Sequence, residues 1–82
     1  MNTVERIAKA RTKSPEWVQS VEDYTGGEPE FTLWALKVDF HVRKVCGFGF
    51  LDLEDVALRD WFDSEVPPAE AARDVLENSG VF

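Results

Sequence analysis

The segment Phe31–Cys46 constrains the fold more than any other part of the sequence, because it contains no Gly, Pro or Asn. Large apolar residues recur at every second position, as in a strand: Trp34, Leu36, Val38, Phe40 and Val42. A helical stripe also runs through the segment, formed by Phe31, Trp34, Ala35, Val38, Val42 and Val45. A typical strand has only about five or six residues, and no turn divides this segment into a hairpin. Its length therefore favours a helix, with a strand as the alternative.

Signals for helix ends flank this segment and divide the sequence before it. Pro29 and Gly47 suit the beginning and the end of a helix over 31–46. Asn2 and Glu5 have the spacing of a capping box, which predicts an amphipathic helix over 3–12.

Ser14-Pro15 predicts the start of a second helix, with the serine side chain capping its first amides and the proline at its first position. Gly26-Gly27 predicts its end near Tyr24, because glycine adopts the left-handed conformation readily. The inner stripe expected for this helix is Trp17, Val18, Val21 and Tyr24.

Two further helices are predicted in the last third of the chain. Asp52 is expected to cap a helix over 53–64, and Pro67-Pro68 to end it and open another over 68–78, with Gly80 as terminator. The residues expected to face inward are Leu53, Val56, Ala57, Trp61 and Phe62 in the first, and Ala71, Ala72, Val75 and Leu76 in the second.

The prediction is therefore an all-α fold: a single domain over 1–82 with about five short helices, ending in an αα-hairpin. Residues 1–28 supply the N-terminal helices, and 30–82 a helical core with an acidic C-terminal half. If 31–46 were a strand, the fold would be α+β.

Negative charge is concentrated at one end of the sequence. Residues 52–77 contain nine acids and only two bases, which accounts for the formal net charge of −7, while residues 1–51 are balanced. An anionic surface of this kind repels the phosphates of nucleic acid. The first helix alone has a basic excess, from Arg6, Lys9, Arg11 and Lys13 against Glu5.

A pattern in the second half resembles the C-terminal part of a group of small acidic helical proteins of bacterial phages and plasmids. The matching residues are Trp34, Val38 and Asp39; Asp52, Leu53 and Asp55; Arg59, Asp60 and Phe62; and Pro68, Glu70, Ala71 and Ala72. The resemblance covers about residues 30–80 and supports a helix over 31–46. Where such sequences often have a glycine, this chain has Ser64-Glu65-Val66. The group has no known chemistry, so the resemblance implies that the chain is encoded on a mobile element but does not indicate an activity.

No residue pattern predicts an enzyme, a cofactor or a metal. Cys46 and His41 are five positions apart and point in different directions on a helix, so they do not suit a nucleophile and its base. One Cys and one His are too few for a closed zinc site, and Gly47-x-Gly49 lacks the rest of a phosphate-binding loop. Counted from Asp52, the acids also miss the glycine and glutamate of an EF-hand.

The sequence also indicates a compartment. Cys46 is the single cysteine, so no internal disulfide is expected, and there is neither an export signal nor an apolar run of about 18 residues. These features predict a cytoplasmic protein without a membrane contact.

The functional prediction is a protein-binding module that binds no nucleic acid directly. Acids three or four residues apart on a helix form a row of charge, which could imitate a phosphate backbone toward a basic nucleic-acid-handling protein of the host. The residues expected to bind that partner are Asp52, Asp55, Asp60, Asp63, Trp61 and Phe62. The alternative is a homo-oligomeric assembly protein, such as a homodimer that buries Phe48, Phe50 and Trp61 or Phe62, with acids that only keep it soluble.

Overall fold

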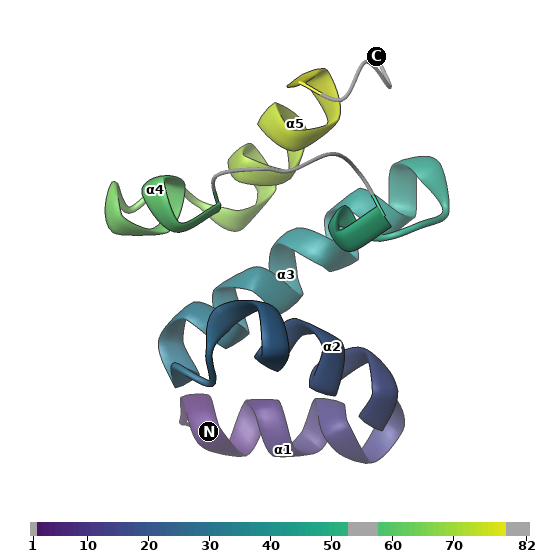
Figure 1. The fold of residues 1–82 in the computed structure, drawn as a ribbon, viewed down its shortest axis with the longest axis vertical. Coiled ribbons are helices and arrows are strands. Elements are labelled where there is room, and N and C mark those ends of the chain that lie inside the picture. Colours follow the sequence, from purple (N-terminus) through teal and green to yellow (C-terminus); the bar gives the residue numbers. More distant parts are fainter. Residues whose placement is uncertain (1, 53–57, 79–82) are drawn as a thin grey trace. The chain divides into compact units, whose positions relative to one another are not determined.

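The computed structural model describes residues 2–52 and 58–78, and these residues contain helices and no strands (Figure 1). The elements are α1 (Thr3–Lys13), α2 (Pro15–Thr25), α3 (Pro29–Cys46), a 3₁₀ helix (Phe50–Asp52), α4 (Leu58–Asp63) and α5 (Pro68–Asn78). The all-α prediction is confirmed, and so is the helix over 31–46. The predicted starts of α1, α2 and α5 agree with the structure to within one residue.

The chain forms two compact units, Met1–Leu36 and Lys37–Phe82, and the boundary between them falls within α3. The first unit contains α1, α2 and the beginning of α3. The second contains the rest of α3, the 3₁₀ helix, α4 and α5. Each unit is described by itself below.

Local signals account for the helix ends in the first unit. Asn2 Oδ1 accepts a hydrogen bond from the Glu5 N–H at 2.9 Å, and Asn2 Nδ2 donates to the Glu5 carboxylate at 3.3 Å. Gly26 ends α2 in the left-handed conformation, with φ of 73°, and its N–H bonds to the Glu22 carbonyl. The predicted Asn2 cap and glycine terminator are thus both present, although the Glu5 carboxylate bonds the Asn2 side-chain amide instead of the backbone N–H of a capping box.

Ser14 differs from the prediction, because its side chain makes no capping hydrogen bond at the start of α2. The residue instead joins two helices through its backbone. Its N–H donates to the Ala10 carbonyl at 2.9 Å and closes α1, while its carbonyl accepts from the Val18 N–H at 3.1 Å and opens α2. Pro15 at the first helical position has no N–H to cap, as expected.

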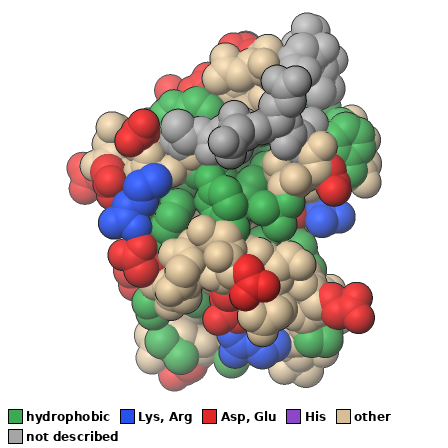
Figure 2. Space-filling view, viewed as in Figure 1, with side chains coloured by type: hydrophobic (Ala, Val, Ile, Leu, Met, Phe, Trp, Pro, Cys, Tyr) green, Lys and Arg blue, Asp and Glu red, His purple; other side chains and the backbone are tan. Residues whose placement is uncertain are grey.

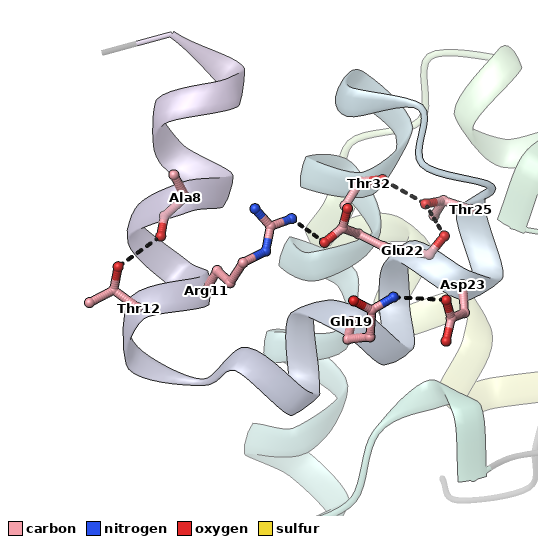
Figure 3. A network of polar contacts seen from close by, with 8 residues as sticks. All are labelled: Ala8, Arg11, Thr12, Gln19, Glu22, Asp23, Thr25 and Thr32. Carbon is pink, nitrogen blue, oxygen red and sulfur yellow. Dashed lines mark hydrogen bonds and ion pairs between the residues drawn. The ribbon is translucent and has the colours of Figure 1, made fainter.

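A buried threonine pair holds α2 to the first turn of α3. Thr25 Oγ1 and Thr32 Oγ1 are 2.6 Å apart, and Thr25 also donates to the Glu22 carbonyl at 3.3 Å (Figure 3). Both threonines are buried, so the mutual hydrogen bond satisfies hydroxyls that water does not reach. An ion pair between Arg11 and Glu22 links α1 to α2.

The apolar interior of each unit follows the predicted stripes with some exceptions. In the first unit, Val18 and Val21 are fully buried, whereas Trp17 is half-buried and Tyr24 is exposed. Along α3 the buried stripe residues are Phe31, Ala35, Val38 and Val42, while Trp34 is half-buried and Val45 is exposed.

The second unit contains α4 and α5. The described helical residues of the predicted helix 53–64 are Leu58–Asp63; residues 53–57, and with them Leu53, Val56 and Ala57, lie outside the described part, as does Gly80. Leu58 is fully buried although it was not among the predicted inward residues. On α5 the predicted set is confirmed, since Ala71, Ala72, Val75 and Leu76 are all buried.

The turn after α4 has an unusual residue. Glu65 adopts a left-handed conformation with φ of 60°. Its N–H bonds to the Phe62 carbonyl at 3.0 Å, and the Val66 N–H bonds to the Trp61 carbonyl at 3.0 Å. These two bonds are those of a Schellman motif, in which glycine usually occupies the position that Glu65 holds here.

A buried carboxylate fixes the connector between α3 and the 3₁₀ helix. Asp39 is 1% exposed; it accepts hydrogen bonds from the Phe50 N–H at 2.8 Å and from Arg43 Nε at 2.7 Å. Gly49 passes directly over it, so closely that a Cβ at this position would be 2.3 Å from Asp39 Oδ1. Asp39 thus provides the hydrogen-bond acceptor that the buried Phe50 N–H needs in place of water.

Candidate protein-binding surfaces

The predicted acidic residues that the structure describes lie at the surface of the second unit. Asp52 is exposed in the 3₁₀ helix, and Asp60 and Asp63 are exposed on α4. Asp60 and Asp63 are three residues apart, which places them on neighbouring positions of one helix face. Asp55, the fourth predicted acid, lies outside the described residues.

Intrahelical ion pairs occupy the two bases of this acidic region. Arg59 Nε is 3.3 Å from Asp63 Oδ2, and Arg73 Nε is 3.4 Å from Glu77 Oε1, both at a spacing of four residues. Within the described ranges, no ion pair joins Asp60, Glu65 or Glu70 to a base. Most of the charge on α4 and α5 is therefore turned toward solvent without compensation.

The predicted aromatic anchors on α4 are half-buried. Trp61 and Phe62 both have intermediate exposure, and the Arg59 guanidinium lies 6.0 Å from the centre of the Phe62 ring. Part of each of these two side chains is therefore accessible. In the sequence of α4 they lie between Asp60 and Asp63. A partner that contacts Phe62 also meets Arg59.

Other apolar side chains of the second unit are more exposed than these. Phe40, Val45, Phe48 and Leu51 are each at least 40% exposed. Phe48 is thus exposed, as the homodimer alternative requires, whereas Phe50 is 1% exposed and part of the interior, and its N–H donates to Asp39. Hydrophobic side chains reach the surface near charged ones on the face drawn in Figure 2.

His41 and Cys46 contact different residues in the structure. The Cys46 thiol donates to the carbonyls of Val42 and Phe48, at 3.3 and 3.2 Å, and the His41 ring packs edge-on against Phe40. A hollow of about 430 Å³ lies on the α3–α5 side of this unit, and Cys46 does not line it. Its lining residues are His41, Lys44, Val45, Ala69, Ala72, Arg73 and Leu76.

The first unit has a cationic hollow of about 450 Å³. The sequence indicated the basic excess of the first helix but not the hollow. Three bases of α1 line it together with small residues and an aromatic ring: Arg6, Lys9, Lys13, Ala10, Ser14 and Trp17. The fourth base of the predicted basic face, Arg11, points elsewhere and pairs with Glu22 (Figure 3). We refer to Arg6, Lys9 and Lys13 as the α1 cation stripe.

Residues 2–52 and 58–78 contain neither a cluster of metal ligands nor a membrane-spanning helix. No three His, Cys, Asp or Glu side chains in these ranges come together as metal ligands would. None of the described helices combines the length and the apolar character that crossing a bilayer requires.

The surfaces and fold define the class of this chain as a small all-helical protein with charged surface patches. Comparisons with protein-family models, with curated protein sequences and with solved structures returned no match.

Proposed function

We propose that this chain is a non-enzymatic protein-binding module of the cytoplasm that uses the surface of α4 to bind a basic protein. The observation that carries the proposal is the combination on α4 of exposed carboxylates and half-buried aromatics, while the only described bases of α4 and α5 are occupied by neighbouring acids. Uncompensated charge steers a basic partner, and an aromatic edge supplies apolar contact.

The most specific form of the proposal is an inhibitor or modulator of a nucleic-acid-handling protein of a bacterial host, encoded on a mobile element. Such a partner has a basic surface that normally binds phosphates, and a row of helix carboxylates offers it similar charge. In this form of the proposal, Asp52, Asp60 and Asp63 provide charge and Trp61 or Phe62 the apolar anchor, with Asp55 included from the sequence.

The test is a pull-down with the tagged chain from bacterial lysate, followed by titration of the captured protein at about 50 and 500 mM salt. We expect the change of Asp52, Asp55, Asp60 and Asp63 to Asn to weaken binding at least about tenfold at low salt, because exposed charge contacts are screened only at high salt. A matched control replaces Glu5, Glu16, Asp23 and Glu28 in the first unit with their amides. Equal affinity of the α4 variant and the wild type would refute the proposal.

The second candidate function is homo-oligomeric assembly, which the exposure of Phe40, Val45, Phe48 and Leu51 favours. In this case the acids are only solubilising. Light scattering after size exclusion would show a mass above that of one chain that persists at about 500 mM salt, and Phe40→Ser would reduce it. Capture of the chain alone from lysate, with such a mass, would favour assembly over partner binding.

A further inference from the structure

We propose that the α1 cation stripe is an interaction surface for α5 of a second copy of this chain. The stripe lines an open hollow, so its three side chains are accessible to a macromolecule. In the part of the chain that the structure describes, no ion pair joins Arg6, Lys9 or Lys13 to a carboxylate. Their charge is therefore available to an external partner.

The three bases form one line along α1. They are separated by three and then four residues, and at about 3.6 residues per turn they fall within about 60° of each other around the helix axis. The line is about 10 Å long, at about 1.5 Å of rise per residue. It therefore presents three positive charges in a row and selects a partner with three negative charges at a similar spacing.

α5 presents such a row on the side opposite its buried face. Glu70, Asp74 and Glu77 are separated by four and then three residues, which is the order of the α1 cation stripe reversed. Glu70 and Glu77 are exposed and Asp74 is half-buried, whereas the apolar side of the helix is covered. We refer to these three residues as the α5 acid stripe.

The reversed spacing specifies an antiparallel arrangement of the two helices. With α5 of one copy antiparallel to α1 of another, Arg6 faces Glu77, Lys9 faces Asp74, and Lys13 faces Glu70. Ala10 and Ser14 line the same hollow as the bases and, being small, let a helix approach closely. Among the ion pairs of the described residues, the one that involves this stripe joins Glu77 to Arg73, which is exposed and 3.4 Å away.

Duplex nucleic acid suits the hollow less well than α5 does. Three phosphate contacts give only weak, salt-sensitive binding. A second copy of the chain carries the matching acids at the matching spacing. The proposal does not depend on the function proposed above, because it uses α5 and leaves Asp60 and Asp63 on α4 available.

The test is sedimentation equilibrium of the purified full chain between about 10 µM and 1 mM. We expect reversible self-association at about 50 mM NaCl that weakens at least tenfold at about 500 mM, because exposed pairs are individually weak and are screened by salt. Lys9→Glu should weaken it about fivefold or more. Lys37→Glu is the matched control, since Lys37 is exposed, carries the same charge and lies outside the stripe; it should change the association less than twofold.

A charge exchange gives the decisive result. One variant carries Arg6→Glu, Lys9→Glu and Lys13→Glu; the other carries Glu70→Lys, Asp74→Lys and Glu77→Lys. Each should be monomeric alone with the helical circular dichroism of the wild type, and their mixture should form a one-to-one complex. A monomer at every concentration at low salt, equal effects of Lys9→Glu and Lys37→Glu, association that salt leaves unchanged, or a mixture that stays monomeric would each overturn the proposal.

Discussion

Asp39 holds the connector between α3 and the 3₁₀ helix in the second unit. Its carboxylate is buried, yet it receives one backbone and one guanidinium hydrogen bond, so its charge is compensated within the structure. Hydrogen bonds to a buried charged group contribute more than neutral ones, and losing one leaves the remaining group unsatisfied. The connector that carries Phe50 into the interior is held in this way.

We expect Asp39→Asn to lower the free energy of unfolding by about 1–3 kcal/mol. An amide can still accept from the Phe50 N–H, but its NH₂ group would face Arg43 Nε, which is also a donor. Urea unfolding followed by circular dichroism measures the difference.

The matched control is Asp63→Asn, because Asp63 also pairs with an arginine four residues away but is exposed. It removes the same charge, and we expect a change within about 0.5 kcal/mol. If the two substitutions cost the same, the burial of Asp39 is not what makes it important.

Gly49 is required for a steric reason. A methyl group there would overlap Asp39 Oδ1, at 2.3 Å, and would lie 2.9 Å from the Arg43 guanidinium. Gly49→Ala should therefore cost about 2 kcal/mol or more, a typical cost of overpacking. In an Asp39→Ala background the same change should cost much less, because the clashing oxygen is gone. A cost independent of the residue at 39 would show that backbone conformation, and not the contact, requires the glycine.

At the scale of the element, helix ends in this chain are set by short local signals. The turn after α4 is the exception, because Glu65 is left-handed without being glycine. A side chain in this conformation costs about 1 kcal/mol, which glycine avoids. We expect Glu65→Gly to raise the free energy of unfolding by about 0.5–1 kcal/mol, measured by urea unfolding.

The control for this prediction is Ser64→Gly, at the neighbouring residue, which is not among those with positive φ. It adds backbone freedom to the unfolded chain without relieving strain, so it should leave stability unchanged or lower. Glu65→Gln removes the same charge as Glu65→Gly but keeps the side chain. If it stabilises as much as the glycine, charge repulsion and not conformation is the cause.

The sequence could predict the features that depend on neighbouring residues, and could not predict those that join separate elements. Asn2, Pro15, Gly26 and Pro68 act on backbone groups within a few residues, so their effects are visible in the sequence. The pair of Thr25 with Thr32 and the bond from Phe50 to Asp39 join residues from separate elements. Hydropathy gives no sign that a carboxylate such as Asp39 is buried, because the partner that satisfies it is distant in sequence.

The candidate surfaces, too, were predictable only where they do not depend on contacts between separate elements. Exposure of the acids on α4 was predictable, since carboxylates are rarely buried without partners. The sequence could not show which bases of α1 remain available to a partner. In the structure Arg11 pairs with Glu22 on another helix, whereas Arg6, Lys9 and Lys13 line the hollow. The exposure of Phe40 agrees with the predicted helix, because Phe40 is not part of the predicted helical stripe.

At the scale of the whole molecule, charge acts on folding and on association in opposite directions. The acidic third of the chain contributes the net charge of −7, and like charges brought together by folding repel one another. Three of the four described ion pairs join side chains that are each at least 25% exposed, and such pairs contribute little; the fourth, Arg43 with Asp39, has a buried carboxylate. Repulsion should therefore outweigh the attraction of these pairs.

We expect salt to stabilise the fold of the monomer while it weakens self-association. At about 5 µM protein, where association is negligible, raising NaCl from about 50 to 500 mM should increase the free energy of urea unfolding by about 0.5–1 kcal/mol, because screening reduces the repulsion among carboxylates. Asp60→Asn removes one uncompensated charge and should reduce this salt effect. A fold that salt destabilises would mean that the ion pairs, Arg43 with buried Asp39 foremost, contribute more than the repulsion costs.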